Sequence, residues 1–297
     1  MKLGDLVVRK SYGGDVMFRI AAMRADQAII KGTDFRLLAD SPLQDLVKVT
    51  NTISIHSKEK QARIKSMEST RLMEQYRKGQ TERSQAELNR KLMNHQPFFE
   101  VPGKVLHLDG DVNYLKKSME LYGQLRVPAE GHYVNEANMG DMLYHLLPRV
   151  RPDIVVITGH DGVLKHLKNR DLYSLNSYKN SENFVKAVRI ARQYERNFDA
   201  LNIIAGACQS HFEALLQAGA NFASSPGRIL IHALDPVYIA VKSSFTPIKD
   251  TIDVVDVIQH TISGTDGLGG IETRGSYRIG IPRIKDLSTL NVTPSAT

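Results

Sequence analysis

The chain has 297 residues, of which 42% are hydrophobic and 24% are charged, and its formal net charge is +7. A chain of this length can bury a substantial core and usually forms more than one domain. No apolar run approaches the roughly eighteen residues of a membrane span, so we expect neither a membrane segment nor a secretory signal. Because Cys208 is the one cysteine, the chain cannot form an intramolecular disulfide, and we expect no cysteine-based zinc site. We expect no metal and no cofactor.

The positive charge is concentrated in one part of the chain. Residues 57–93 contain ten Lys or Arg and five Asp or Glu, which gives 10 − 5 = +5, and the rest is close to balanced. Tyr76 is the one aromatic residue of that stretch. Nucleic-acid-binding faces usually spread basic residues over a fold and combine them with aromatic ones, so nucleic acid is not an expected partner.

The first fifty residues predict a small β domain. Five short apolar runs are separated by glycine- and proline-containing turns; they lie at 6–8, 16–20, 27–31, 35–38 and 46–49. Five short strands in so few residues are typical of a small closed barrel of SH3-like size. We place this domain at residues 1–52. It is either a binding module or an element that packs on the main domain.

A charged helix is predicted to follow the barrel. Residues 57–93 contain one glycine and no proline, and their apolar positions are sparse. This pattern predicts one long helix or two that are weakly buried, within a linker at residues 53–98. The exposed arginines, Arg71, Arg77, Arg83 and Arg90, make this helix a candidate site of self-cleavage.

From about residue 99 the pattern predicts an α/β domain that continues to residue 285, followed by a tail at 286–297. Apolar strands are expected at 104–108, 128–133, 153–157, 201–205 and 228–234. Helices are expected at 114–125, 138–147, 183–196 and 212–218. Strands that alternate with helices indicate a mostly parallel sheet covered on both faces.

Polar residues follow several of these strands directly. Asp109 and Asp111 follow the first strand, His160 follows the third, Cys208 the fourth and Asp235 the fifth. Sites in parallel sheets form at the carboxyl ends of the strands. We therefore expect these residues to gather at one edge of the sheet.

Cys208 and His160 have the chemistry of a nucleophile and its base. A cysteine on a sharp strand-to-helix turn presents its sulfur at the sheet edge, and the small Gly206 and Ala207 let a substrate approach. A lone buried cysteine is more often a small core residue, but the polar neighbours of Cys208, Gln209 and Ser210, are not typical of a hydrophobic core.

The spacing of this pair is that of caspase-type sites. His160 precedes Cys208 by 48 residues, and Ala207-Cys208-Gln209 matches the Ala-Cys core of that signature. One departure is that Asp161 separates His160 from Gly162. We expect the backbone amides of Asp161 and Cys208 to hold the oxyanion, with Gly162 as the alternative donor.

Several segments together resemble a known family. These segments are 8–12, 104–111, 158–161, 206–213, 218–226 and 267–275. They resemble the YabG family of sporulation-specific peptidases, and the resemblance extends from about residue 1 to about residue 282. The resemblance implies a caspase-like cysteine peptidase of endospore-forming bacteria that cleaves after arginine. Its catalytic residues fall on Cys208 and His160. Its substrates would be spore coat and cortex-associated proteins, and the enzyme would be made in the cytoplasm of the sporulating cell and associate with the coat.

Arginine at a cleavage site requires an acidic partner in the substrate pocket. The candidates are Asp109, Asp111, Asp235 and Glu272, of which we favour Asp109 and Asp235. Asp161 could also serve, or could orient His160. Each of these acids could instead cap a helix or stabilise a turn.

Two other functions use the same residues. An amidase or acyltransferase could carry the cysteine turn, although in glutamine amidotransferases the histidine follows the cysteine in the chain, whereas here it precedes it. A non-catalytic coat scaffold built on the N-terminal barrel would leave Cys208 inert, and its thiol would then alkylate no faster than free cysteine.

Overall fold

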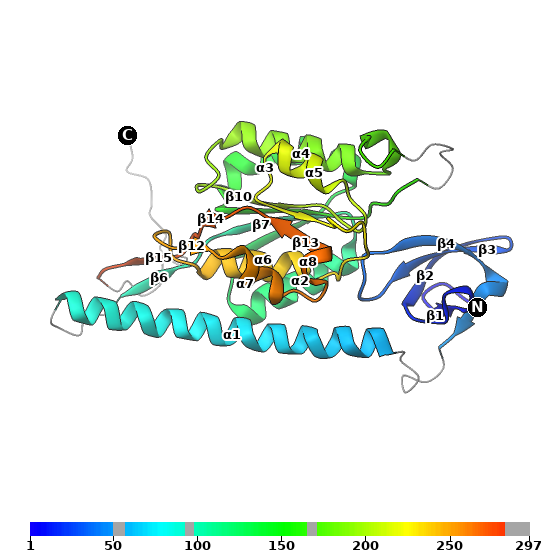
Figure 1. Cartoon of the computed structure of the whole chain (residues 1–297), viewed down its shortest axis with the longest axis horizontal. Coiled ribbons are helices and arrows are strands. Elements are labelled where there is room, and N and C mark those ends of the chain that lie inside the picture. The colour runs from blue at the N-terminus through cyan, green and yellow to red at the C-terminus, as the bar shows by residue number, and fades with distance from the viewer. Residues whose placement is uncertain (50–56, 93–97, 165–170, 283–297) are drawn as a thin grey trace, which may run out of the picture.

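The computed structural model describes residues 1–49, 57–92, 98–164 and 171–282. It contains a small antiparallel sheet at the N-terminus, a long helix and a larger mixed sheet covered by helices on both faces (Figure 1). Within the described residues no helix is long and apolar enough to cross a membrane. The domain limits predicted above stay predictions, and the predicted tail at 286–297 lies outside the described residues.

The N-terminal sheet has five antiparallel strands in the order β4-β3-β2-β1-β5. Their bounds are β1 Leu6–Arg9, β2 Met17–Arg24, β3 Gln27–Gly32, β4 Leu38–Pro42 and β5 Leu46–Lys48. One side of this sheet buries a compact apolar cluster that includes Val7, Phe18 and Ile30. The strand predicted at 35–38 was wrong, because Phe35 and Arg36 leave the sheet and contact the main domain, and β4 begins only at Leu38.

The central sheet has six strands in the order β13-β11-β10-β9-β7-β8. Their bounds are β7 Val105–Asp109, β8 Ala129–Tyr133, β9 Ile154–Thr158, β10 Asn202–Ala205, β11 Phe222–Ser224 and β13 Leu268–Gly270. The first five are parallel, and β13 pairs antiparallel with β11. The expected mostly parallel α/β sheet is confirmed. The strand predicted at 228–234 was wrong, because the fifth parallel strand is β11 and the apolar run after it is a loop, in which residues 231–233 are buried and Ile229 is exposed.

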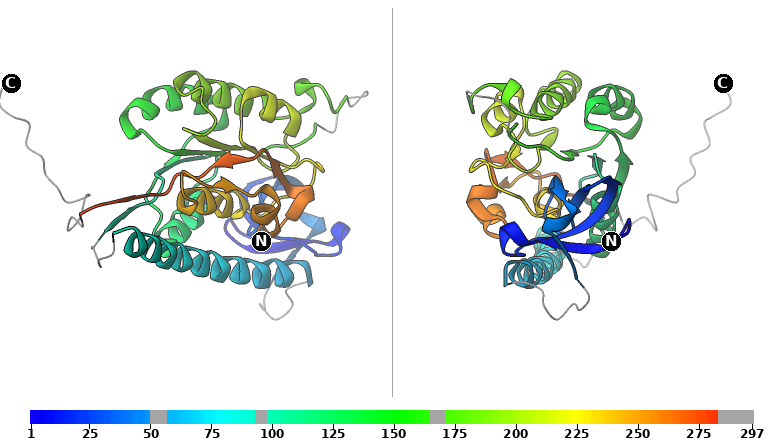
Figure 2. Two further views of the ribbon diagram at one scale, coloured as in Figure 1. Left: turned by 60° about the vertical axis from the view of Figure 1, so that its left-hand side comes forward. Right: turned by 90° about the vertical axis from the view of Figure 1, so that its right-hand side faces the viewer.

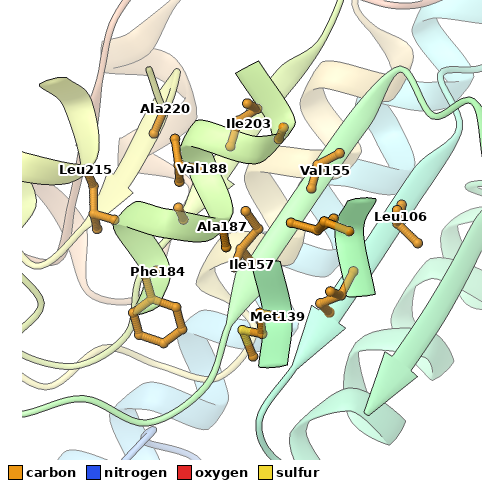
Figure 3. Close-up of a cluster of buried hydrophobic side chains, with 14 of the residues drawn as sticks. Leu106, Met139, Val155, Ile157, Phe184, Ala187, Val188, Ile203, Leu215 and Ala220 are labelled. Atoms are coloured by element: carbon orange, nitrogen blue, oxygen red, sulfur yellow. The ribbon is translucent and has the colours of Figure 1, made fainter. Parts of the chain in front are cut away.

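One face of the central sheet is covered by α3 (Met139–Val150), α4 (Ser181–Tyr194) and α5 (Phe212–Ala218). Figure 3 shows how Phe184 and Val188 of α4 and Met139 of α3 reach toward Val155 and Ile157 of β9. These side chains are fully buried. Burial of such aliphatic and aromatic groups is the main force that holds a helix layer on a sheet.

The other face is covered by α2 (Val112–Leu125), α6 (Asp235–Phe245) and α7 (Val254–Gln259), with α1 (Ser57–Leu92) lying outside them (Figures 1 and 2). Every residue of α6 is buried. The expectation of a weakly buried α1 is confirmed: much of the helix is exposed, and one narrow stripe, which includes Met73 and Leu88, is buried against the domain. Ser66 of α1 also hydrogen-bonds to the Tyr238 hydroxyl of α6 at 2.9 Å. Because most residues of α1 are polar, the sequence did not indicate which residues form this narrow stripe.

Short elements complete the described chain. They are the strands β6 Phe99–Val101, β12 Thr251–Ile252, β14 Thr273–Arg274 and β15 Arg278–Gly280, the helix α8 Gly264–Gly267 and the 3₁₀ turns η1 Lys10–Tyr12, η2 Leu43–Asp45, η4 Glu136–Asn138 and η5 Leu175–Ser177. β15 pairs with β6, and β14 pairs with β12. β14 lies beside the start of β10, where the Asn202 side chain donates to the Arg274 carbonyl at 3.1 Å.

Candidate active site

Cys208 and His160 lie at the same edge of the central sheet. β9 and β10 are adjacent and parallel, and Ala205 pairs with Ile157 at their carboxyl ends. His160 and Cys208 each follow that pair by three residues, 157 + 3 and 205 + 3. The edge contains the ends of all five parallel strands, as parallel sheets place their sites.

The chain turns sharply around Cys208. Gly206 has a φ of 109° and Gln209 a φ of 55°, both in the left-handed region. A Cβ at Gly206 would lie 2.9 Å from Leu215 Cδ1 and 3.1 Å from Ser224 Cβ, so a side chain there would also have little space. The turn is fixed by a 2.9 Å hydrogen bond from the Ala207 amide to the Ser210 hydroxyl. Backbone held in such conformations is typical of sites where the fold positions a reactive group.

The Cys208 thiol is buried and engaged in this state. Its side chain is 1% exposed, and its sulfur accepts a hydrogen bond from the Ile231 amide at 3.1 Å. Burial raises the pKa of the thiol to about 12, which the bond from Ile231 offsets only in part. The thiolate, which is the nucleophile, is therefore strongly disfavoured in this arrangement.

His160 is buried beside two carboxylates. Its backbone amide donates to Glu136 Oε1 at 2.8 Å, and its Nε2 lies 3.7 Å from Asp111 Oδ2. Nε2 makes no hydrogen bond with any described residue. Within the described chain Cys208 Sγ is bonded to Ile231 and not to His160. The structure therefore brings the two residues to one edge without forming a thiol–imidazole contact.

Glu136 is a site residue that the sequence interpretation missed. It follows β8 in the turn η4, at the same sheet edge, and its carboxylate lies 3.7 Å from His160 Nδ1. Burial alone would raise the pKa of this carboxyl, but its interactions with His160 outweigh burial and lower it. A Cβ at Gly159 would lie 2.6 Å from Glu136 Oε1, so this glycine makes room for the carboxylate. Its place after a parallel strand was the signal that could have identified Glu136.

The Asp161 carboxylate joins the histidine loop to the cysteine loop. It accepts hydrogen bonds from the Gly162 amide at 2.8 Å, the Asn180 amide at 2.8 Å, the Ser210 hydroxyl at 2.9 Å and the Ser181 hydroxyl. Burial raises the pKa of this carboxyl against the effect of those donors. Asp161 therefore fixes the loops and lies away from His160's ring nitrogens.

The predicted oxyanion donors differ in availability. The Gly162 amide is engaged with the Asp161 carboxylate. Among the described residues, the amides of Asp161 and Cys208 donate no hydrogen bond. Of the two alternatives considered from the sequence, the pair of Asp161 and Cys208 amides is thus the one still free to bind an oxyanion.

Asp109 is occupied by an arginine of the loop between β3 and β4. Arg36 Nη1 and Nη2 donate to the two Asp109 oxygens at 3.0 and 2.8 Å, and both side chains are 0% exposed. Thr158 Oγ1 and the Asp111 amide also donate to Asp109, at 3.0 and 2.9 Å. Burial would raise the pKa of the Asp109 carboxyl, but the Arg36 charge holds it well below its usual range.

Asp111 and Asp235 have structural partners. Asp111 caps α2 by accepting from the Asn113 amide at 2.8 Å, and it accepts from Lys31 Nζ at 2.7 Å. Asp235, in the first turn of α6, accepts from the Ile262 amide at 2.7 Å and from the amides of His232 and Ser263 at 3.1 and 3.3 Å. Neither carboxylate is free to receive a substrate arginine in this state.

Glu272 does not lie in this site. It is exposed and directly precedes β14, beside the start of β10, so it lies at the opposite edge of the sheet from Cys208. His211, three residues after Cys208, has its Nε2 3.0 Å from the Tyr173 carbonyl and its Nδ1 3.2 Å from Glu213 Oε2. Within the described residues no group of three or more His, Cys, Asp or Glu could hold a metal ion.

Comparisons with known proteins identify the family of this chain. The chain is 46% identical over 286 residues to the sporulation-specific protease YabG of Bacillus subtilis (strain 168), which covers 95% of this chain and 98% of that protein. No solved structure matches. The profile of the YabG peptidase family U57 matches residues 2–282. The chain therefore belongs to the YabG family of peptidases.

Proposed function

We propose that this chain is a cysteine endopeptidase that cleaves after arginine, with Cys208 as nucleophile and His160 as general base. The observation that carries this proposal is the register of β9 and β10, which ends both strands at the same edge with His160 and Cys208 three residues beyond the last pair. The unpartnered Nε2 of His160 leaves a nitrogen available for the thiol proton. The position of this pair after neighbouring strands supports a caspase-like arrangement of the catalytic domain.

The reaction follows from these groups. Nε2 of His160 removes the thiol proton, and the sulfur of Cys208 attacks the carbonyl carbon of the scissile bond. The amides of Asp161 and Cys208 donate to the oxyanion that forms. His160 then returns the proton to the leaving amine, which leaves an acyl group on sulfur. Water, deprotonated by His160, attacks that thioester, and the Cys208 sulfur leaves and takes the proton back from His160. Each step needs the thiol to leave the Ile231 amide and turn to His160.

Asp109 is the residue that we propose to bind the arginine of the substrate. Its carboxylate lies at the end of β7, the strand next to β9, and already binds one guanidinium in the bidentate geometry that suits arginine. A lysine cannot form this fork, so the same pocket would discriminate between the two basic residues. Asp109→Asn should lower kcat/KM for arginyl peptides more than it lowers kcat/KM for peptides with another residue before the scissile bond.

The relative from Bacillus subtilis is a sporulation-specific protease, and we extend that role to this chain. We propose that its substrates are spore coat and cortex-associated proteins and that the enzyme associates with the coat. Self-cleavage within α1 belongs to the same proposal: Arg71, Arg83 and Arg90 are exposed there, although the helix must unwind before a peptidase can bind it. Identical fragments from stored wild type and Cys208→Ala would exclude self-cleavage.

The test compares the wild type with Cys208→Ala and His160→Ala on fluorogenic peptides that carry Arg, Lys, Asp or Leu before the scissile bond. We expect cleavage of the arginyl peptide alone and its loss in both variants. The matched control is His145→Ala, which removes an exposed histidine of α3 and should leave the rate unchanged. Cleavage that survives Cys208→Ala would overturn the assignment of the nucleophile.

A further inference from the structure

A segment of the N-terminal sheet lies across the candidate active site. Phe35 forms an isolated antiparallel bridge with His232, in the loop that follows β11. The Arg36 amide donates to the Ile231 carbonyl at 3.1 Å, and the Ala233 amide donates to the Asp34 carbonyl at 2.8 Å. Three residues of the small domain thus pair as a strand with the loop of the main domain that also binds the Cys208 sulfur.

The Arg36 side chain of that segment enters the main domain at Asp109, the residue proposed above to bind the arginine of a substrate. Arg36 is fully buried, its guanidinium pairs with both oxygens of Asp109, and its Nη2 also donates to the Ala233 carbonyl at 3.1 Å. An extended peptide paired with an exposed strand edge, with one side chain in a specific pocket, is a recurrent mode of peptide recognition. Asp34–Arg36 has the features of such a bound peptide.

The segment is fixed from the other side by α2. The Tyr114 hydroxyl donates to the carbonyls of Gly32 and Phe35, both at 2.6 Å, and Lys117 Nζ contacts Asp34 Oδ1 at 2.8 Å. The ring of Tyr114 lies between the two sites, 5.0 Å from the Arg36 guanidinium carbon and 5.7 Å from the His160 ring. The contacts that hold the segment therefore extend to the catalytic histidine.

We infer that Asp34–Arg36 is an intramolecular occupant of the substrate groove, bound as an arginyl peptide would be, and that it lowers the activity of the enzyme. This inference rests on the proposed peptidase function. The burial of both Cys208 and His160, at 1% and 5% exposure, supports it, because a peptidase cannot act on another protein while its nucleophile is covered. A substrate binds only after the segment has left, so its apparent affinity is reduced by the fraction of open molecules.

The first test closes the groove covalently. Phe35 and His232 face each other between two hydrogen bonds, a non-hydrogen-bonded antiparallel pair whose Cα atoms are about 4.5 Å apart in general. That separation suits a disulfide. In Phe35→Cys/His232→Cys we expect cleavage of an arginyl peptide to fall roughly tenfold or more on oxidation and to return on reduction. The two single variants, treated identically, are the controls.

The second test opens the groove. We expect Arg36→Ala to raise the rate of arginyl-peptide cleavage by roughly tenfold and to accelerate alkylation of Cys208 by iodoacetamide. Arg24→Ala, an exposed arginine of the same sheet, is the matched control and should change neither rate. Mass spectrometry assigns the label to Cys208. The disulfide variant keeps the test valid if Arg36→Ala does not fold.

The outcomes separate the two proposals. An oxidised double variant that remains as active as its reduced form would overturn the inference and leave the peptidase function intact. Faster labelling of Cys208 in Arg36→Ala, with no cleavage of any peptide, would support occupation of the groove and overturn the peptidase function. Equal labelling of wild type, Arg36→Ala and Arg24→Ala would also overturn the inference.

Discussion

The guanidinium of Arg36, between β3 and β4, and the carboxylate of Asp109, at the end of β7, lie 73 residues apart in the chain and form a bidentate pair with neither side chain exposed to solvent. Removing one member of a buried ion pair leaves the other charge without compensation, which is far more costly than losing an exposed pair. This pair therefore couples the position of the small domain to the electrostatics of the candidate active site.

Arg36→Ala should lower stability and create a binding site for an arginyl ligand. We expect the free energy of unfolding to fall by about 3–5 kcal/mol, because Asp109 stays charged and buried without its partner. The peptide amide Thr-Asp-Phe-Arg, the sequence of residues 33–36, should bind the variant and raise its melting temperature. Thermal unfolding with increasing peptide measures this effect. A similar rise in the wild type, or with a peptide that has Gln in place of Arg, would contradict the prediction.

The reactivity of Cys208 should depend on pH in the manner of a buried thiol. Because burial raises the pKa of its thiol to about 12, the protonated thiol contributes stability that is complete below the unfolded pKa, about 8.5, and is lost as pH rises toward 12. Iodoacetamide should label Cys208 in the native wild type on the order of a hundredfold more slowly at pH 9 than in urea-unfolded protein. Stability should decline less steeply above pH 9 in Cys208→Ala. Equal native and unfolded labelling rates would refute the buried thiol.

Asp161→Asn should loosen the connection between the histidine and cysteine loops. One carboxylate oxygen becomes an NH2 group that faces donors, so at least one hydrogen bond is lost and one buried donor is left unpaired. We expect a loss of about 1–3 kcal/mol in the free energy of unfolding and a lower kcat/KM. A double-mutant cycle with Ser210→Ala should give a coupling energy above about 0.5 kcal/mol, because the two side chains are in contact. Asp141→Asn, an exposed aspartate of α3, is the control, and additive effects of Asp161→Asn and Ser210→Ala would count against the connection.

Gly159→Ala should displace Glu136 and with it His160. The added Cβ would lie 2.6 Å from Glu136 Oε1, so the carboxylate that accepts from the His160 amide must move. A displacement of about 1 Å in a catalytic group can lower the rate on the order of a hundredfold, and we expect kcat to fall by ten- to a hundredfold. Gly123→Ala, in the last turn of α2, is the control: its Cβ meets no atom within 4 Å, so kcat should stay unchanged. An unchanged kcat in Gly159→Ala would exclude a positioning role for Glu136.

The arrangement of the central sheet could be predicted where apolar runs end at polar residues. β7 ends at Asp109, β9 is followed by His160 and β10 by Cys208, and the period of the pattern identifies these strands without knowledge of their partners. The apolar run at 228–234 gave the wrong result for a physical reason. It forms a loop whose residues 231–233 are buried beside the segment that carries Phe35, and hydrophobicity alone cannot distinguish such a loop from a buried strand.

The contacts among the residues of the candidate site were less predictable than its location at the edge of the sheet. The sequence indicated Cys208, His160 and Asp109, but not that Arg36 occupies Asp109, since nothing local connects residues so distant in the chain. Arg36 instead stood in an apolar run that resembled a strand of the small sheet. Glu136 was missed because a short strand of intermediate burial, β8, precedes it, and that strand carries a weaker pattern than β7 or β9.

The position of Arg36 near the N-terminus also orders events during synthesis. Arg36 leaves the ribosome 208 − 36 = 172 residues before Cys208, and N-terminal domains usually fold first. The small sheet is thus available when β7, β9 and β10 assemble, and its loop fills the groove as the groove forms. If Asp34–Arg36 restrains the enzyme as inferred above, that restraint is in place as soon as Cys208 is folded into the sheet edge.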